Sequence, residues 1–308
     1  MNKIDILLAT YNAESHISAL LHSLQDQTFT EWSLIVHDDG SSDKTPAILE
    51  RFASSDERIT VLHDDKRFGS AQGNFMYLLT QSQAPFAIFC DDDDIWLEDK
   101  LQVLYENILQ RDNTIPQAVW CNSYMYKPQT AEIGGSATLA ILSSLRDTLF
   151  ANCGVQGCAI LFNAALRNVC LPAPEVVAMH DHLLTLAALT FGEMTYVPRH
   201  LMLYRRHADT VTGYTVGRRS EKVRGFFGAG KGVLDPLHFR AVRSFYEAHC
   251  EQMTPETDAV FQKFFAFEGR SRISNAFHVL TDGFSLFGHR SILIAKLLLR
   301  PLFPKKKP

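Results

Sequence analysis

Short apolar runs alternate with amphipathic segments over the first 126 residues of the chain. The runs that predict buried strands cover residues 4–9, 32–37, 59–62, 86–90 and 118–126. Between them, residues 17–24, 70–81 and 97–110 have helical spacing, and Thr45-Pro46 is a helix-start signal. Strands separated by helices form parallel βαβ units, so the sequence predicts an α/β fold with a mostly parallel sheet flanked by helices.

The pattern becomes less regular after residue 127. Residues 129–144 are rich in small side chains and predict a loop, followed by a strand at 154–162, a helix at 181–190 and a strand at 202–206. From Tyr214 onward the pattern is mostly helical, with basic residues interspersed. We therefore expect a domain that ends near residue 213 and a helical, basic C-terminal region over residues 214–308.

Composition and charge narrow the class of protein. Of 308 residues, 46% are hydrophobic and 21% are charged, which is typical of a globular protein and not of a disordered one. The six cysteines are scattered, the first residues lack the features of a signal peptide, and no apolar run would span a bilayer. These features predict free thiols and a cytoplasmic protein. The net charge of −4 combines an acidic front, residues 1–110, with a basic remainder.

Polar clusters follow three of the predicted strands. Thr10-Tyr11-Asn12 ends the first, Asp38-Asp39 the second and Asp91-Asp92-Asp93-Asp94 the fourth. In an open parallel sheet, ligands bind outside the carboxyl ends of the strands. We therefore expect these clusters to share one crevice.

The four consecutive aspartates are the strongest local feature. Carboxylates crowded on one loop raise one another's pKa values unless a cation neutralises them, and Mg²⁺ or Mn²⁺ prefers such oxygen ligands. The alternative is a solvated acidic turn. The apolar strand before the run and Ile95-Trp96 after it anchor the loop on both sides and favour the cation site.

These clusters, together with Asp99-Lys100, resemble a family 2 glycosyltransferase of the GT-A fold, and more narrowly its bacterial rhamnosyltransferase-like branch. Further blocks that match are Gln156-Gly157-Cys158, Met179-His180-Asp181 and the segment 203–207. The resemblance covers residues 3–213. It implies a Rossmann-like GT-A domain with a nucleotide-binding half at about 1–126 and an acceptor half at about 127–213.

The resemblance also implies roles for residues at the strand ends. Asp39 would accept a hydrogen bond from the N3–H of a pyrimidine base, with Asp38 as the weaker candidate. Asp93 would ligate Mn²⁺ or Mg²⁺, and Asp91 or Asp92 would face the ribose or support the metal; the register of the Asp-x-Asp pair within the quartet stays open. The remaining candidates for nucleotide binding are Thr10, Tyr11, Asn12, Gly69 and Asn74.

Downstream residues would complete the site. Asp181 matches the catalytic base, which takes a proton from the acceptor hydroxyl; the alternative is that it only caps the helix that follows. His207 is a candidate metal ligand or diphosphate contact, or a surface histidine. Arg205 and Arg206 suit a diphosphate through bidentate geometry, although either residue would also suit a structural ion pair.

Residues 286–303 predict a helix at a membrane interface. His289, Lys296 and Arg300 fall on one stripe of that helix, the apolar residues lie broadly opposite, and Lys305-Lys306-Lys307 follows. The alternative is a helix packed on the protein core with a solubilising tail. The membrane interpretation suits an enzyme on the inner face of the cytoplasmic membrane.

The function that these predictions favour is an inverting, metal-dependent glycosyltransferase. It would move a sugar from dTDP-rhamnose or a UDP-hexose to a lipid-linked saccharide in O-antigen or capsule synthesis. The alternative from another class is a non-catalytic nucleotide-sugar binding module at the membrane surface, and a hydrolase would use the same site with water. Nucleic-acid binding is disfavoured because the front is acidic and no basic motif is interleaved with aromatic residues.

Overall fold

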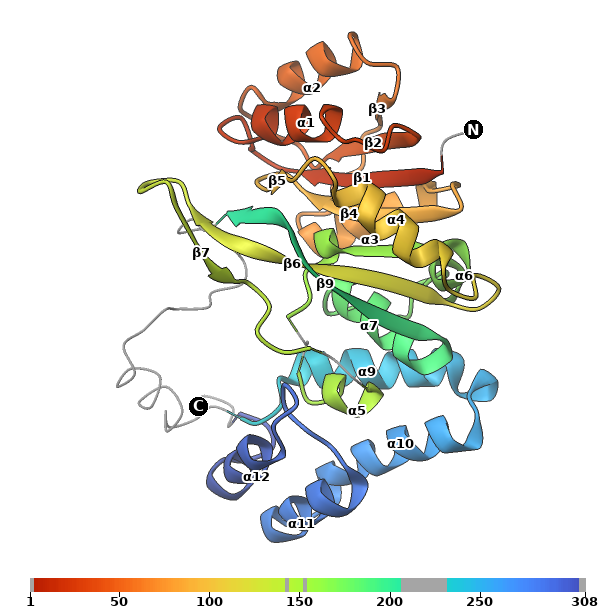
Figure 1. Ribbon diagram of the computed structural model, residues 1–308. Coiled ribbons are helices and arrows are strands. Elements are labelled where there is room, and N and C mark those ends of the chain that lie inside the picture. Colours follow the sequence, from red (N-terminus) through yellow and green to blue (C-terminus); the bar gives the residue numbers. More distant parts are fainter. Residues whose placement is uncertain (1–2, 142–143, 152–153, 206–231, 305–308) are drawn as a thin grey trace. The chain divides into compact units, whose positions relative to one another are not determined.

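The structure is a computed structural model that describes residues 3–141, 144–151, 154–205 and 232–304 (Figure 1). They divide into two compact units, which we describe separately. Unit 1 comprises the described parts of residues 1–139, 154–173 and 179–206, and unit 2 those of residues 140–153, 174–178 and 207–308. Two short segments from the middle of the chain thus belong with the C-terminal helices.

Unit 1 is built around one sheet. Among the described residues the strand order is β3-β2-β1-β4-β8-β6-β9-β5, and β7 pairs with β6. The strands β3, β2, β1 and β4 are mutually parallel, whereas β8 is antiparallel to both of its neighbours. The strands are β1 (Ile4–Thr10), β2 (Trp32–Asp38), β3 (Ile59–Val61), β4 (Phe86–Asp91), β5 (Ile95–Trp96), β6 (Gln117–Lys127), β7 (Glu132–Ser136), β8 (Ile160–Asn163) and β9 (Glu193–Arg205). The predicted α/β fold is confirmed.

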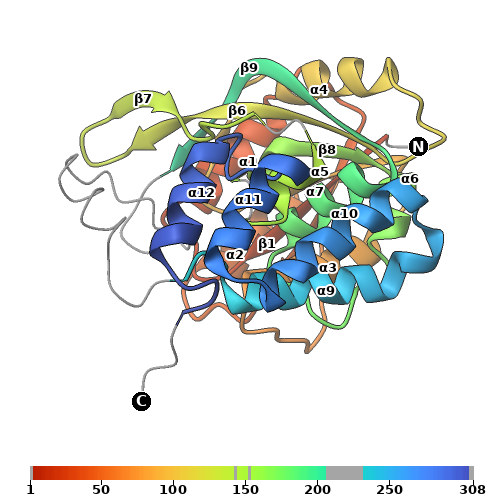
Figure 2. The same cartoon turned by 90° about the horizontal axis from the view of Figure 1, so that it is seen from below.

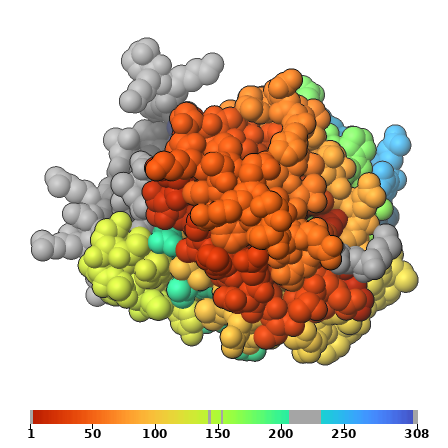
Figure 3. Space-filling view, turned by 90° about the horizontal axis from the view of Figure 1, so that it is seen from above, coloured from red at the N-terminus to blue at the C-terminus, as the bar shows by residue number. Residues whose placement is uncertain are grey.

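Helices cover both faces of this sheet. The helices of unit 1 are α1 (Ile17–Gln25), α2 (Thr45–Ala53), α3 (Ala71–Gln81), α4 (Lys100–Leu109), α6 (Ala164–Val169) and α7 (His180–Phe191), with the short 3-10 helix η1 (Gly157–Ala159) before β8. Side chains of α1, α2 and α4 share one hydrophobic core with β1, β2 and β4. On the other face Phe75 of α3 packs edge-to-face on Phe89 of β4, and α7 also contacts α3. Figure 3 shows the surface of the first hundred residues in red and orange, with the yellow-green β6–β7 hairpin at its margin.

Four local predictions differ from the structure in type or bounds. The helix expected from residue 97 begins at Lys100, since Ile95 and Trp96 pair with β9 as strand β5. The loop expected at 129–144 contains β7, which completes a hairpin with β6. The strand expected at 154–162 is shorter, as β8, and the one expected at 202–206 is the end of the longer β9.

Unit 2 is helical in its described residues. It contains α5 (Leu145–Thr148), α9 (Pro236–His249), α10 (Pro255–Phe265), α11 (Arg272–Asp282) and α12 (Arg290–Leu299), with the 3-10 helices η2 (Cys250–Gln252) and η3 (Ala266–Gly269). Its core is rich in phenylalanine: Phe150 makes edge-to-face contacts with Phe264, Phe267 and Phe284. None of the described helices combines the length and the hydropathy that crossing a bilayer requires.

Candidate active site

The polar ends of β1, β2 and β4 lie side by side at one edge of the sheet. Thr10 is opposite Asp38 in the β1–β2 register, and Ala9 is opposite Asp91 in the β1–β4 register. The hydroxyl of Thr10 donates a hydrogen bond of 3.1 Å to Asp38 Oδ1. The structure therefore brings the three predicted clusters together, as the parallel topology requires.

Hydrogen bonds connect the loops that follow β1 and β2. Asp38 accepts hydrogen bonds from the backbone N–H groups of Gly40 and Ser41, so its carboxylate closes the turn that follows β2. Asn12, which has a left-handed φ of 52°, accepts a bond from Ser42 N–H. Tyr11 N–H donates to Asp92 Oδ2 at 3.0 Å, while the Tyr11 side chain is 61% exposed. An exposed aromatic ring beside carboxylates is suited to contact with a flat ligand.

Asp39 orders the segment that contains Gly69. Its Oδ1 accepts a bond of 2.6 Å from Phe68 N–H, and Gly69 follows with a left-handed φ of 63°, which favours glycine. Asn74, in contrast, is buried, and both atoms of its side-chain amide bond to His37. Asp39 and Gly69 therefore lie near the surface of the site, whereas Asn74 is buried beneath it and holds His37 in place.

The acidic loop carries two strongly shifted carboxyl groups. Burial raises the pKa of Asp91 to about 7, with further increases from the nearby Asp93 and Asp181 carboxylates. Burial also raises the pKa of Asp92 to about 7, again with contributions from Asp93 and Asp91, although the bond from Tyr11 N–H opposes the shift. Two groups that titrate near neutrality at one loop are a feature of functional sites.

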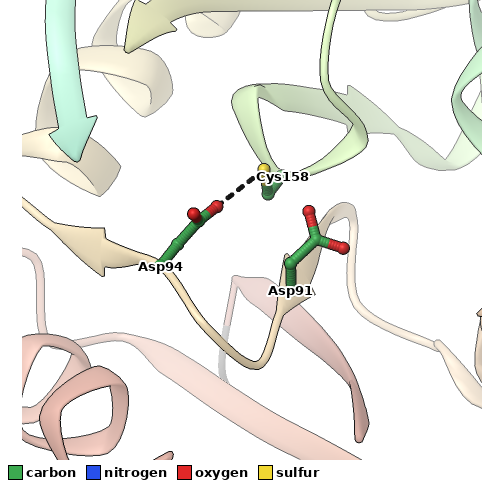
Figure 4. A group of neighbouring side chains, drawn as sticks. All are labelled: Asp91, Asp94 and Cys158. Carbon is green, nitrogen blue, oxygen red and sulfur yellow. Dashed lines mark hydrogen bonds between the residues drawn. The ribbon is translucent and has the colours of Figure 1, made fainter. Parts of the chain in front are cut away.

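Asp94 and Cys158 lie on the buried side of this loop. Asp94 is fully buried and accepts a hydrogen bond of 3.2 Å from the Cys158 thiol (Figure 4). It accepts a second bond of 3.2 Å from Arg205 N–H. The carboxylate oxygens of Asp91 and Asp94 and the Cys158 sulfur lie within 4.8 Å of one another. Burial raises the pKa of the Cys158 thiol well above its usual range, so in the metal-free protein the thiol keeps its proton and donates a hydrogen bond to Asp94.

The donor set at this loop fits a hard divalent cation. Burial and mutual repulsion disfavour the charged forms of the carboxylates in this loop. A bound cation would relieve that repulsion. Asp91 and Asp94 bring carboxylate oxygens close together beside Cys158, and Asp93 adds a further carboxylate to the same loop.

A buried lysine lies below the acidic loop. Lys100, the first residue of α4, is fully buried, and burial lowers its pKa. Its ammonium donates to the Cys158 carbonyl oxygen at 2.7 Å and lies 3.3 Å from the centre of the Trp96 ring. Lys100 thereby connects α4, β5 and η1, the three elements that surround the loop.

Asp181 lies in the first turn of α7, next to the acidic loop. The helix begins at His180 after Met179, and Asp181 Oδ1 accepts a bond of 2.6 Å from His182 N–H. Two observations place it at the site: its charge raises the pKa of Asp91, and its Cβ lies 3.5 Å from where a Cβ on Gly157 would be. The sequence had separated these groups by about ninety residues.

His180 fixes the start of the same helix. It is buried against Phe75 and Phe89, with ring centroids 4.0 and 4.7 Å away, and burial lowers its pKa to about 3. The ring is therefore neutral at physiological pH and serves as a packing residue beside Asp181.

Replacing Gly157 by alanine is expected to destabilise the fold by about 1–3 kcal/mol and to reduce activity, because overpacking moves the start of α7. The new Cβ would overlap His180 Nε2, and the rings of Phe75 and Phe89 hold that imidazole in place. Urea unfolding measures the loss. Gly134→Ala is the control, since nothing lies within 4 Å of a Cβ at that position; equal stability of the two variants would contradict this packing.

Arg205 supports the acidic loop from β9. It is 7% exposed, its backbone N–H donates to Asp94, and its Nε donates to the Asp93 carbonyl oxygen at 2.6 Å. Its guanidinium also lies over the Tyr126 ring at 5.3 Å. The two neighbouring candidates, Arg206 and His207, lie outside the described residues.

Sequence reasoning missed three members of this site: Asp94 as the buried acceptor, Cys158 as its donor and Lys100 as the buried cation. Asp94 and Cys158 lie 64 residues apart and meet only through the sheet. One signal was available for Lys100: a lone lysine next to the apolar residues of a helix start.

The sequence profile described as Glycosyl transferase family 2 matches residues 5–169, more than half of the chain. The chain belongs to this family. Among curated relatives, WfgD of Escherichia coli, a UDP-Glc:alpha-D-GlcNAc-diphosphoundecaprenol beta-1,3-glucosyltransferase, is 32% identical over 54% of this chain and 62% of its own length. RfbG of Shigella flexneri, a dTDP-rhamnosyl transferase, is 27% identical over 70% of this chain and 77% of its own.

The match to other family members is partial. GlyG of Streptococcus pneumoniae, a glycosyltransferase, is 28% identical over 35% of this chain and 36% of its own. The matched part of this chain thus spans 36% to 62% of the full length of three of its curated relatives. The family profile, over residues 5–169, includes the ends of β1, β2 and β4.

Solved structures confirm the fold. Residues 1–349 of S. aureus TarS in complex with UDP-GlcNAc align with a TM-score of 0.57 at 18% identity, over 86% of this chain and 72% of TarS 1–349. The mannosyltransferase PcManGT from Pyrobaculum calidifontis, in complex with GDP-Man and Mn²⁺, aligns with a TM-score of 0.50 at 16% identity, over 96% and 86% of the two chains. At these identities the likeness shows a common GT-A architecture.

Proposed function

We propose that this protein is an inverting, metal-dependent glycosyltransferase. The observation that carries the proposal is the position of Asp181 at the start of α7, where its charge acts on Asp91 in the loop after β4. Membership of glycosyl transferase family 2 supports the same activity. The reaction needs a base for the acceptor hydroxyl and a cation for the leaving diphosphate. Asp181 would supply the first, and the acidic loop would hold the second.

In the proposed reaction, Asp181 accepts the proton of an acceptor hydroxyl while that oxygen forms a bond to C1 of the donor sugar. The bond between C1 and the diphosphate oxygen breaks on the opposite face, and the nucleoside diphosphate leaves with the electron pair. Asp91 and Asp93 would hold a divalent cation, which would supply neutralisation of the diphosphate charge. Arg205 keeps the acidic loop in place through its bonds to Asp93 and Asp94.

The nucleotide is assigned to the edge formed by β1, β2 and the segment before α3. Asp39 is proposed to accept from the N3–H of uracil or thymine, with Thr10, Tyr11, Asn12 and Gly69 around it and with Asp38 and Asn74 as supporting residues. Arg206 stays a proposed diphosphate contact, and His207 a proposed metal ligand or diphosphate contact. The relatives act with UDP-glucose or as dTDP-rhamnosyl transferases, so a UDP-hexose or dTDP-rhamnose is the proposed donor.

The proposed acceptor is a lipid-linked saccharide in the synthesis of a cell-surface polysaccharide such as an O-antigen or capsule. WfgD and a Campylobacter jejuni relative both act on undecaprenol diphosphate-linked sugars. This acceptor would place the enzyme at the inner face of the cytoplasmic membrane. A non-catalytic nucleotide-sugar module is the alternative, and Asp181 favours the enzyme because donor binding does not require a base.

Titration calorimetry with UDP, dTDP and GDP, with and without Mn²⁺, tests the nucleotide site. We expect UDP or dTDP to bind at least about tenfold more tightly with Mn²⁺ than without it, and GDP to bind more weakly, because Asp39 complements a pyrimidine N3–H. Asp39→Ala should remove the preference for the pyrimidine. Absence of binding by all three nucleotides, with the protein folded, would contradict the proposal.

A further inference from the structure

Helix α11 presents a stripe of large apolar side chains on the surface of unit 2. Ile273, Phe277 and Leu280 are 77%, 60% and 58% exposed. Their spacing of four and three residues places them on one face of the helix, while Ala276 and Val279 on another face are buried. A stripe of this kind marks a contact surface more often than scattered single residues do.

Helix α12 repeats the arrangement beside it. Leu293 and Leu297 are buried, whereas Ile292, Leu298 and Leu299 are 39%, 46% and 56% exposed. The two helices pack against each other and run side by side in both cartoon views (Figures 1 and 2). The helix predicted over residues 286–303 is shorter, Arg290–Leu299, and its apolar residues lie partly inside unit 2 and partly outside.

The charges around these helices are nearly all positive. Residues 270–304 contain five basic side chains, Arg270, Arg272, Arg290, Lys296 and Arg300, and one acidic residue, Asp282. Asp282 already contacts Lys263 at 3.2 Å and His278 at 3.0 Å. The sequence continues with three consecutive lysines at 305–307. Two copies of such a surface repel each other, whereas an anionic surface attracts it.

We propose that the outer faces of α11 and α12 dock on an anionic lipid bilayer. Ile273, Phe277 and Leu280 enter the boundary between headgroups and acyl chains, and the flanking cations contact lipid phosphates. The inference uses residues of unit 2 alone, so it goes beyond the proposed glycosyl transfer and does not depend on it. It adds α11 to the helix that the sequence pattern indicated.

Co-sedimentation with vesicles tests the proposal. We expect the full chain to bind vesicles of equal parts phosphatidylglycerol and phosphatidylcholine, to bind phosphatidylcholine vesicles weakly, and to lose affinity as salt rises. The double variant Phe277→Glu/Leu280→Glu should reduce binding to the anionic vesicles by about tenfold or more, because it removes two inserting side chains and adds two like charges.

The control is Leu109→Glu in α4 of unit 1, which introduces a glutamate at a leucine of similar exposure, 52%. It should bind vesicles as the parent does, and nucleotide calorimetry on all variants separates this result from failure of the proposed function. Equal vesicle binding by the double variant and the control would overturn the proposal. The proposal would also be overturned if the parent protein did not bind anionic vesicles. The same holds if the parent is a dimer that the double substitution dissociates.

Discussion

Replacing Asp181 by asparagine is expected to lower the rate of sugar transfer by about 10²–10⁴-fold, the usual contribution of a general base. Asparagine keeps the shape of the side chain, and its Oδ1 can still accept the bond from His182 N–H. It cannot take a proton from the acceptor hydroxyl. Nucleotide binding should therefore persist, because the residues assigned to the nucleotide lie on other elements, at the ends of β1 and β2.

Transfer to a membrane extract, measured beside calorimetry with UDP and Mn²⁺, checks this result. Glu193→Gln is the matched control, since it removes an exposed carboxylate just after α7 and should leave transfer unchanged. A third readout is the pH dependence of metal binding. The Asp181 charge raises the pKa of Asp91, so Asp181→Asn should lower the pH at which the acidic loop binds metal. Retained turnover in Asp181→Asn would remove it as the base.

Divalent metal is expected to bind more tightly as pH rises from about 6 to about 8, by up to about tenfold per unit below pH 7 for each proton displaced. The pKa values of Asp91 and Asp92 are raised to about 7, so below that pH these carboxyls are largely protonated in the metal-free protein. A cation must displace those protons, and it binds more easily once they have dissociated. Transfer should follow the same rise.

The stability of the metal-free protein should change in the opposite direction. Between about pH 4 and pH 7 the folded chain holds protons on these carboxyls that the unfolded chain has already lost, so the free energy of unfolding falls as pH rises. Their contribution is fully present below about pH 4 and is lost as pH passes 7. Bound metal removes this loss, and the thermal shift caused by Mn²⁺ should be larger at pH 8 than at pH 6.

Metal titrations in two buffers of different ionisation enthalpy measure the protons released, and thermal melts at both pH values measure the stability change. Asp91→Asn should reduce the pH dependence, because it removes one of the two carboxyls whose pKa is raised. Asp112→Asn is the control, because bonds from Thr114 lower the pKa of that exposed carboxyl and it lies outside the acidic loop. A metal affinity that is flat from pH 6 to pH 8 would contradict the raised pKa values.

Sequence reasoning was most successful where local pattern and topology agree. The starts of β1, β2 and β4 follow from apolar runs, since buried parallel strands are mostly apolar, and the start of α2 follows from Thr45-Pro46. Parallel order then places Thr10, Asp38 and Asp91 at one edge, because βαβ connections return each strand in the same direction.

Sequence reasoning failed where a residue's role depends on a partner far along the chain. Residues 97–99 look like the start of a helix, but the helix begins at Lys100, after residues 95–96 have paired with β9. The bonds that join the Asn74 amide to His37, 37 residues away, could not be predicted from the sequence either. The buried bonds of Lys100 to Cys158 and of Cys158 to Asp94 join residues about sixty positions apart, and no periodicity reports such a bond.

The sequence by itself determined the α/β class, the acidic edge of the sheet and the excess of positive charge behind it, because apolar spacing and charge are local properties of the chain. Only the tertiary structure decided which aspartates titrate near neutrality, that Asp181 lies beside them, and which leucines of α12 are buried. Burial and electrostatic coupling depend on distances through space, and the fold alone sets those distances.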